Sequence, residues 1–150
     1  MVFGILRIMM DINFKIEDQV VGTELATKLK KLGAKQNSYF VWYKGELIPR
    51  SDIPEEVDDN DVFAAFTSQE LGWMLPKGVE CDGIKLYLGM DKGGSDNRME
   101  IWYEKSDGTT WKEDCFMSTG NEAYDRGCIL AILLENGVKV GMAEGDSKES

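Results

Sequence analysis

The sequence predicts a single α+β domain, in which a mainly antiparallel sheet of about four to six strands packs against three helices in a sandwich-like arrangement. Three observations lead to this fold class. Residues 84–90 and 98–105 alternate apolar and polar side chains with the period of two that half-buried strands show. Two segments, 67–70 and 119–122, have the residue pattern of a helix-capping box. A chain of 150 residues also has the length of one ordinary domain.

We expect the domain to cover residues 11–140. Residues 1–10 are predicted to be an N-terminal extension, because Met9 and Met10 are alternative starts and the apolar residues before them lack the basic opening and cleavage site of a signal peptide. Residues 141–150 are small and polar, so we expect a disordered tail. The choice of start among Met1, Met9 and Met10 stays open.

The first helix is expected from about Val20 to Leu32, since Leu25, Leu29 and Leu32 recur on one helical face and Gly33 suits the position after the last turn. Aromatic and β-branched residues at 38–43 then predict a strand. Together with the apolar pair at 47–48, that strand forms a hairpin around residues 44–45.

Residues 50–61 are predicted to form a solvated acidic loop. The next helix has the clearest start in the chain, because Thr67 and Glu70 occupy the two positions of a capping box, and Phe66 and Leu71 flank it as a hydrophobic staple. We expect this helix to begin at residue 68 and to end before Pro76.

The second half of the chain predicts an antiparallel meander followed by the longest helix. Its strands are expected at 84–90 and 98–105, with a third around 109–112 that extends toward Phe116. The capping box at 119–122 then opens a helix over 120–136. A short edge strand is expected at 138–140.

The centre of this last helix, residues 128–134, is apolar nearly all round. Such a helix is either deeply buried or covered on two sides, by the sheet and by another helix or a second subunit. The second alternative is a homodimer through the helix at 120–136.

Composition excludes several classes of function. The net charge of −10, from 17 basic and 27 acidic residues, has the wrong sign for direct nucleic-acid binding or for an anionic membrane. The chain has no His, which excludes Ser-His-Asp, Cys-His and HExxH centres and removes the commonest metal ligand.

The cysteines Cys81, Cys115 and Cys128 form no CxxC pair and are expected to be reduced thiols of a cytoplasmic protein. No apolar run approaches the roughly 18 residues of a membrane span. We therefore expect no metal, no cofactor and no membrane association.

Two apparent ligand motifs do not match their templates. The acids Asp58, Asp59 and Asp61 suggest a calcium loop, but Phe63 and Ala64 stand where an oxygen ligand and a glycine are required. Residues 91–94 lack the spacing of a phosphate-binding loop, so we expect a plain hairpin connection there.

The tryptophans are more informative. If the apolar residues of 98–105 face the core, Trp102 points to the other side of the sheet between Glu100 and Glu104, with Trp111 beside it on the next strand. An exposed aromatic group framed by acids is typical of a protein-binding face. The alternative is that a helix covers this side as well. The acids Asp58, Asp59 and Asp61 are a second candidate surface.

Three stretches taken together resemble a group of small uncharacterised proteins of tailed phages and prophages. They run from Glu17 to Ser38, from Ala65 to Pro76, and from Asn121 to Gly137. The resemblance covers most of residues 17–140. It implies a phage or prophage gene expressed in a bacterial cytoplasm, and it implies no activity and no site residues.

The sequence thus favours a non-enzymatic accessory factor of phage type that binds a host or phage protein. One alternative is an acidic DNA mimic that inhibits a host nuclease or DNA-binding protein. Another is an enzyme that depends on carboxylates alone, which would need an acid whose pKa is raised by burial.

Overall fold

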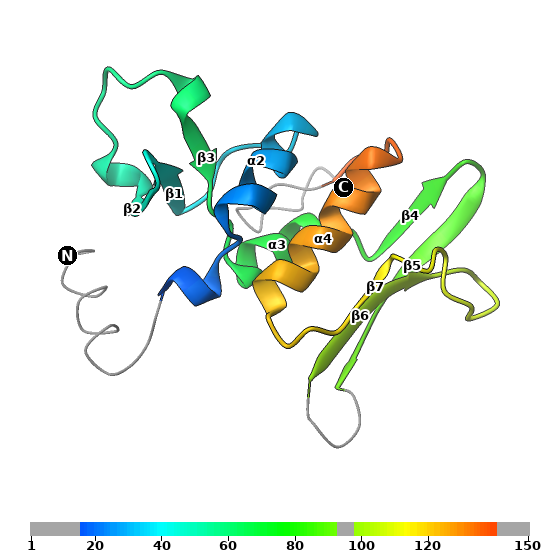
Figure 1. Ribbon diagram of the computed structural model, residues 1–150. Helices are drawn as coiled ribbons and strands as arrows, with labels where there is room; N and C mark the ends of the chain where they lie inside the picture. The colour runs from blue at the N-terminus through cyan, green and yellow to red at the C-terminus, as the bar shows by residue number, and fades with distance from the viewer. Residues whose placement is uncertain (1–15, 93–97, 141–150) are drawn as a thin grey trace.

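The computed structural model describes residues 16–92 and 98–140 (Figure 1). The expectations for residues 1–10, for the connection at 93–97 and for the tail at 141–150 lie outside these ranges. The α-helices are α2 (Thr23–Lys31), α3 (Ser68–Met74) and α4 (Glu122–Glu135). Short 3-10 helices are η1 (Ile16–Gln19), η2 (Arg50–Asp52) and η3 (Asp59–Asp61). The strands are β1 (Phe40–Tyr43), β2 (Glu46–Pro49), β3 (Val62–Ala64), β4 (Gly78–Cys81), β5 (Ile84–Lys92), β6 (Met99–Glu104) and β7 (Phe116–Met117).

The strands form two antiparallel sheets with the helices between them (Figure 1). The three-stranded sheet has the order β2-β1-β3 and the four-stranded sheet the order β4-β5-β6-β7. Helix α2 packs against β3, α4 packs against β6 and β7, and α3 packs against α4. The predicted α+β class with three helices is confirmed. The described residues contain seven strands, slightly more than the expected four to six, and these form two sheets with the helical layer between them.

The three-stranded sheet contains the predicted hairpin. Strands β1 and β2 pair through Val41 and Ile48, and the turn residues Lys44 and Gly45 have φ angles of 52° and 78°. Positive φ at both central residues is the geometry of a type I′ turn, which suits the twist of paired strands. Strand β3 was not predicted. It returns after the acidic loop and pairs with the other edge of β1.

The predicted meander is correct for β5 and β6 but wrong at its third strand. Residues 109–112 contribute one isolated bridge, between Thr110 and Glu104, and the strand beside β6 is β7 at Phe116–Met117. Strand β4 was not predicted either. It precedes β5 through Asp82 and Gly83, which have φ angles of 52° and 80°.

Two predicted helix starts are shifted and one predicted strand is absent. Val20 forms a bridge with Thr67, so α2 begins at Thr23 and η1 lies before it. The N-cap of α4 is Asn121, whose side chain accepts from the amide of Tyr124, and so Thr119 is not the cap. Residues 138–140 are described but form no strand.

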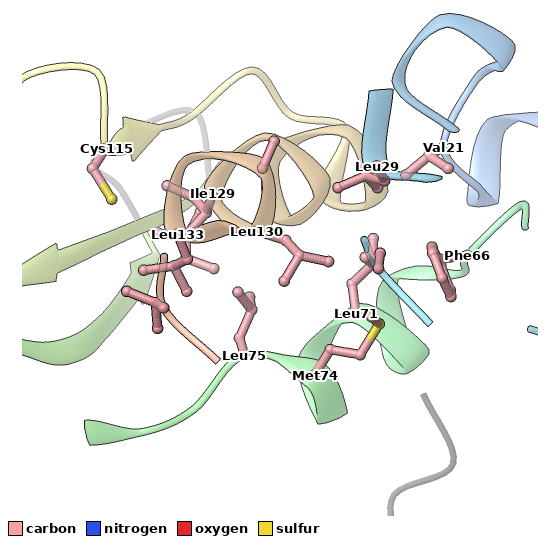
Figure 2. Close-up of a cluster of buried hydrophobic side chains, with 14 of the residues drawn as sticks. Val21, Leu29, Phe66, Leu71, Met74, Leu75, Cys115, Ile129, Leu130 and Leu133 are labelled. Atoms are coloured by element: carbon pink, nitrogen blue, oxygen red, sulfur yellow. The ribbon is translucent and has the colours of Figure 1, made fainter. Parts of the chain in front are cut away.

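Helix α4 is at the centre of the core (Figure 2). Its buried side chains face both α3 and the four-stranded sheet. The large side chains of the whole core cluster that are fully buried include Leu29, Phe66, Leu71, Met74, Ile129, Leu130 and Leu133. Coverage by other elements of the same chain accounts for the apolar character of this helix. The homodimer stays a prediction.

Gly127 lets α4 approach α2 closely. A Cβ atom at this position would lie 2.7 Å from Cδ2 of Leu25 and 2.9 Å from Cγ1 of Val21. Val21 is fully buried just before α2, and Leu25 is half-buried on α2 against the core, so the extra methyl group would disturb this packing.

We therefore expect Gly127→Ala to lower the free energy of unfolding by about 1–3 kcal/mol, because overpacking outweighs the gain in helix propensity. The measurement is urea unfolding followed by circular dichroism. Gly72→Ala in α3 is the matched control, since its Cβ would meet only the end of the Arg126 side chain, at 3.0 Å. An equal effect of the two substitutions would contradict the packing argument.

Candidate functional site

The outer face of the four-stranded sheet is the surface that the alternation around Trp102 indicated. Ile101 and Tyr103 are buried on the face toward α4, so the alternating residues of β6 point to the opposite side. The strand register places their neighbours on the same side. We call this set the outer face: Gly78, Glu80, Lys85, Tyr87, Gly89, Asp91, Glu100, Trp102, Glu104 and Phe116.

Trp102 is held in place by three neighbours on the outer face. Its ring stacks on that of Phe116, with centroids 5.7 Å apart and planes inclined by 23°. Its indole Nε1 donates a hydrogen bond to Oε1 of Glu104 over 2.8 Å. The ring lies over Gly89, where a Cβ atom would come within 2.3 Å of it. The glycine is therefore the cross-strand partner that leaves room for the indole.

The outer face is accessible. Tyr87 is 43% exposed and Phe116 is 40% exposed, whereas α4 covers only the other side of the sheet (Figure 1). Beside Tyr87 lies a shallow hollow of about 270 Å³, lined by Gly78, Val79, Glu80, Lys85, Leu86 and Tyr87. Aromatic rings and a neighbouring hollow form a surface onto which another molecule can pack.

The outer face is also acidic. Among the residues of the outer face, Glu80, Asp91, Glu100 and Glu104 are acidic and Lys85 is basic. Within residues 16–92 and 98–140, none of the four carboxylates forms an ion pair, and Lys85 forms none with Glu80 opposite it. Their charge is therefore directed to solvent or to a ligand.

The placement of Trp111 beside Trp102 was wrong. The chain turns after β6 and returns so that the Trp111 amide donates to the Tyr103 carbonyl, which puts the Trp111 side chain on the core side of the sheet. There it packs partly against the core, with Nζ of Lys112 5.2 Å from its ring centroid. The aromatic neighbour of Trp102 is Phe116, which was not among the predicted site residues.

The second candidate surface is separate from the first. Asp58, Asp59 and Asp61 are exposed in the loop that joins the edges of the three-stranded sheet, across the helical layer from the outer face (Figure 1). Asp58 caps η3 by accepting from the amide of Asn60, and Lys30 binds the carbonyls of Asp59 and Val62. No group of three or more His, Cys, Asp or Glu that could hold a metal is found in the described part of the chain.

The buried carboxylates are engaged in folding. Glu70 is fully buried, and it accepts from the amides of Thr67 at 2.9 Å and Tyr39 at 2.8 Å and from the Thr67 hydroxyl. This confirms the predicted capping box, and burial raises the pKa of Glu70. Asp125 accepts from the amide and hydroxyl of Thr119. Both carboxylates thus act as hydrogen-bond acceptors for backbone at helix starts.

The three cysteines are free thiols on three different elements or loops. Burial raises the pKa of Cys115 to about 11 and also raises that of Cys128. A thiol with a raised pKa is a poor nucleophile near neutral pH.

A polar hollow of about 600 Å³ lies between η1 and the starts of α3 and α4, lined by Asp18, Gln19, Ser68, Thr119, Gly120, Asn121, Glu122 and Ala123. The hydroxyl of Thr119 binds Asp125, and the side chain of Asn121 caps α4. These two polar side chains of the hollow are therefore already used in the start of α4.

Comparison of the chain with protein-family models, curated proteins and solved structures finds no match. None of the helices within residues 16–92 and 98–140 combines the length and apolarity that a membrane span requires.

We expect Gly89→Ala to displace Trp102, because the added methyl group would overlap the indole and break its bond to Glu104. The observable is the near-ultraviolet circular dichroism of the aromatic side chains, which should lose intensity while the helical signal is kept. Gly78→Ala is the control on the same face, since its Cβ would meet Tyr87 at an ordinary 3.8 Å. Identical spectra for Gly89→Ala and the wild type would show that the ring does not depend on this glycine.

The stability of the protein should also depend on the ionisation of Glu70. Because burial raises its pKa in the folded state, its contribution is fully present below the ordinary pKa of a Glu and is lost as the pH rises through the raised value. Glu70→Gln removes this titration. The stability of the wild type relative to Glu70→Gln should therefore fall in urea unfolding as the pH rises above about 4, the ordinary pKa of a Glu.

Glu55→Gln, at an exposed position of the acidic loop, controls for the loss of one negative charge. If the advantage of the wild type over Glu70→Gln grew with pH instead, the hydrogen bonds to Glu70 would outweigh its burial, and folding would lower the pKa of this carboxyl.

Proposed function

We propose that the protein is a non-enzymatic binding factor that docks another protein on the outer face of the four-stranded sheet. The observation that carries this proposal is the stacked pair Trp102–Phe116, together with Tyr87, on the side of the sheet opposite α4. Aromatic side chains of this kind dominate the energetics of protein interfaces.

The rigidity of Trp102 supports binding. Stacking, the bond to Glu104 and the position over Gly89 fix the indole before any partner arrives. A contact group that is already ordered loses little conformational entropy on association, so more of its contact energy appears as affinity. A ring needed only to fill the core would face α4.

The proposed occupant is a separate protein with a positive contact surface. The outer face presents four carboxylates that form no ion pair within the described residues, and the whole chain has a net charge of −10. Charge complementarity would steer such a partner to this face. The resemblance to phage and prophage proteins directs the search to proteins of a bacterial host or of the phage itself.

The positions of the acidic side chains give less support to the alternative that the protein mimics DNA. A mimic of a duplex needs its negative charges along one continuous surface, like the phosphates that it replaces. In this protein the candidate acids fall on two surfaces separated by the helical layer, at the outer face and at the loop containing Asp58, Asp59 and Asp61.

Site-specific photo-crosslinking tests the location of the docking surface. The photoreactive amino acid p-benzoylphenylalanine replaces Tyr87 or Phe116 on the outer face, and replaces Tyr39 or Tyr124 at control positions that are similarly exposed. In living host cells we expect one defined protein to crosslink from positions 87 and 116 only. Crosslinks of that protein from 39 or 124 alone would place the interface elsewhere and reject the proposal.

The crosslinked partner, once purified, allows a quantitative test. We expect Phe116→Ala to weaken its binding about tenfold or more in calorimetry, because the substitution removes one half of the aromatic stack. Tyr124→Ala removes a comparably exposed ring from α4 and should leave the affinity unchanged. Equal affinities of Phe116→Ala and the wild type would contradict the aromatic contact.

A further inference from the structure

We propose that the segment bound on the outer face carries arginine, and that guanidinium groups pack on the Trp102–Phe116 stack while they pair with Glu100 and Glu104. This inference rests on the proposed function, because it names the chemistry of the partner at the same face. Three features of the face support it.

The first feature is the pattern of alternating charge and aromatic surface along β6. Glu100 and Glu104 lie two residues before and after Trp102, so the period of the strand puts all three side chains on one face. The aromatic surface is therefore bracketed by negative charge at both ends. A side chain that is both cationic and able to stack fits this arrangement.

The second feature is the state of the Glu104 carboxylate. Its Oε1 accepts from the Trp102 indole, which fixes the carboxylate beside the ring, and within residues 16–92 and 98–140 no donor binds its Oε2. The indole donor supplies no net charge. Glu104 therefore offers a positioned, negatively charged acceptor at the edge of the aromatic stack.

The third feature is the geometry of the cation itself. A guanidinium is planar, stacks on aromatic rings and presents several N–H donors that match a carboxylate, whereas the ammonium of Lys is a compact charge that is strongly hydrated. An aromatic pair next to carboxylates thus favours Arg over Lys. Lys85 stands on β5 opposite Glu80, at the far side of Tyr87 from Trp102, so it does not neutralise Glu100 or Glu104.

The same features disfavour other occupants. Phosphate groups of nucleic acids or lipids would be repelled by the carboxylates. A second copy of this chain placed face to face would bring two acidic surfaces together, which is unfavourable. An uncharged apolar segment would leave the carboxylates desolvated without a partner, which costs free energy.

Fluorescence anisotropy with defined peptides tests the inference. The probes are a short fluorescein-labelled peptide that alternates Arg and Ser, its isomer with Lys in place of Arg, and an isomer with Glu. We expect the Arg peptide to bind about fivefold more tightly than the Lys peptide, from the stacking of the guanidinium. We expect no binding of the Glu peptide.

Matched variants separate the site from general charge attraction. The double variant Glu100→Gln with Glu104→Gln keeps the side-chain shapes and the acceptor for Trp102, and should weaken binding of the Arg peptide about tenfold. Asp58→Asn with Asp59→Asn removes the same charge from the acidic loop and should have little effect. Equal losses for the two double variants, or equal affinity for Arg and Lys peptides, would overturn the inference.

The two proposals fail in different ways. If a protein crosslinks from positions 87 and 116 but the Arg peptide does not compete with it, the docking face stands and its arginine chemistry is wrong. If the Arg peptide binds and loses affinity only in the Glu100 and Glu104 double variant, while the host protein crosslinks elsewhere, the arginine site stands and the proposed function is wrong.

Discussion

The buried carboxylate of Glu70 is the constraint that joins the two halves of the fold. Helix α3 has only seven residues, a length at which a helix is not stable alone. Glu70 closes its capping box with Thr67, and its other oxygen accepts the amide of Tyr39 just before β1. One side chain thus ties the start of a helix to the start of a sheet. Burying a carboxylate is costly, and these hydrogen bonds offset that cost by satisfying both oxygens.

Further hydrogen bonds extend the same junction. Arg50 donates to the carbonyls of Ser38 and Gln36, and Trp42 donates its indole N–H to the carbonyl of Val21. The amide of Val21 in turn binds the carbonyl of Phe66, next to the capping box. The three-stranded sheet therefore meets the helical layer through polar contacts to backbone in addition to buried apolar residues such as Val41 and Ala64. The four-stranded sheet instead meets it through the apolar side chains of α4.

Local patterns in the sequence correctly predicted the strands, turns and caps whose conformation depends on residues close by in the chain. The alternation in β5 and β6, the turn at Lys44 and the cap at Thr67 follow from strand period, turn conformation and side-chain reach, all of which act within a few residues. The Asp82-Gly83 pair was a usable sign of the missed hairpin between β4 and β5, because Asp-Gly is among the strongest two-residue turn signals. Strand β3 gave no such sign, since it has three residues and is stabilised by a partner far away in the chain.

The candidate site was predictable in part for the same reason. The side of the sheet to which Trp102 points follows from the alternation of β6 alone. The neighbours of Trp102 do not follow from this alternation, because Gly89 and Phe116 are placed beside it by the register between strands. Trp111 was wrongly expected beside Trp102 because the third strand was placed too early in the sequence. Register between strands that are separated by turns depends on tertiary contacts, which a single strand's pattern does not contain.

The acidity of the chain therefore has two distinct physical roles. Glu70 and Asp125 are buried. Glu70 accepts hydrogen bonds from Thr67, the N-cap of α3, and Asp125 accepts from Thr119 in the loop before α4, so both carboxylates contribute to the fold. Glu100 and Glu104 are only partly buried, lie beside an ordered aromatic stack and have no ion-pair partner within the described residues. The fold does not require charge at these two positions, because the core lies on the other face of β6. Carboxylates held there can attract and orient a cationic group from outside the domain, which is the role that we propose for them.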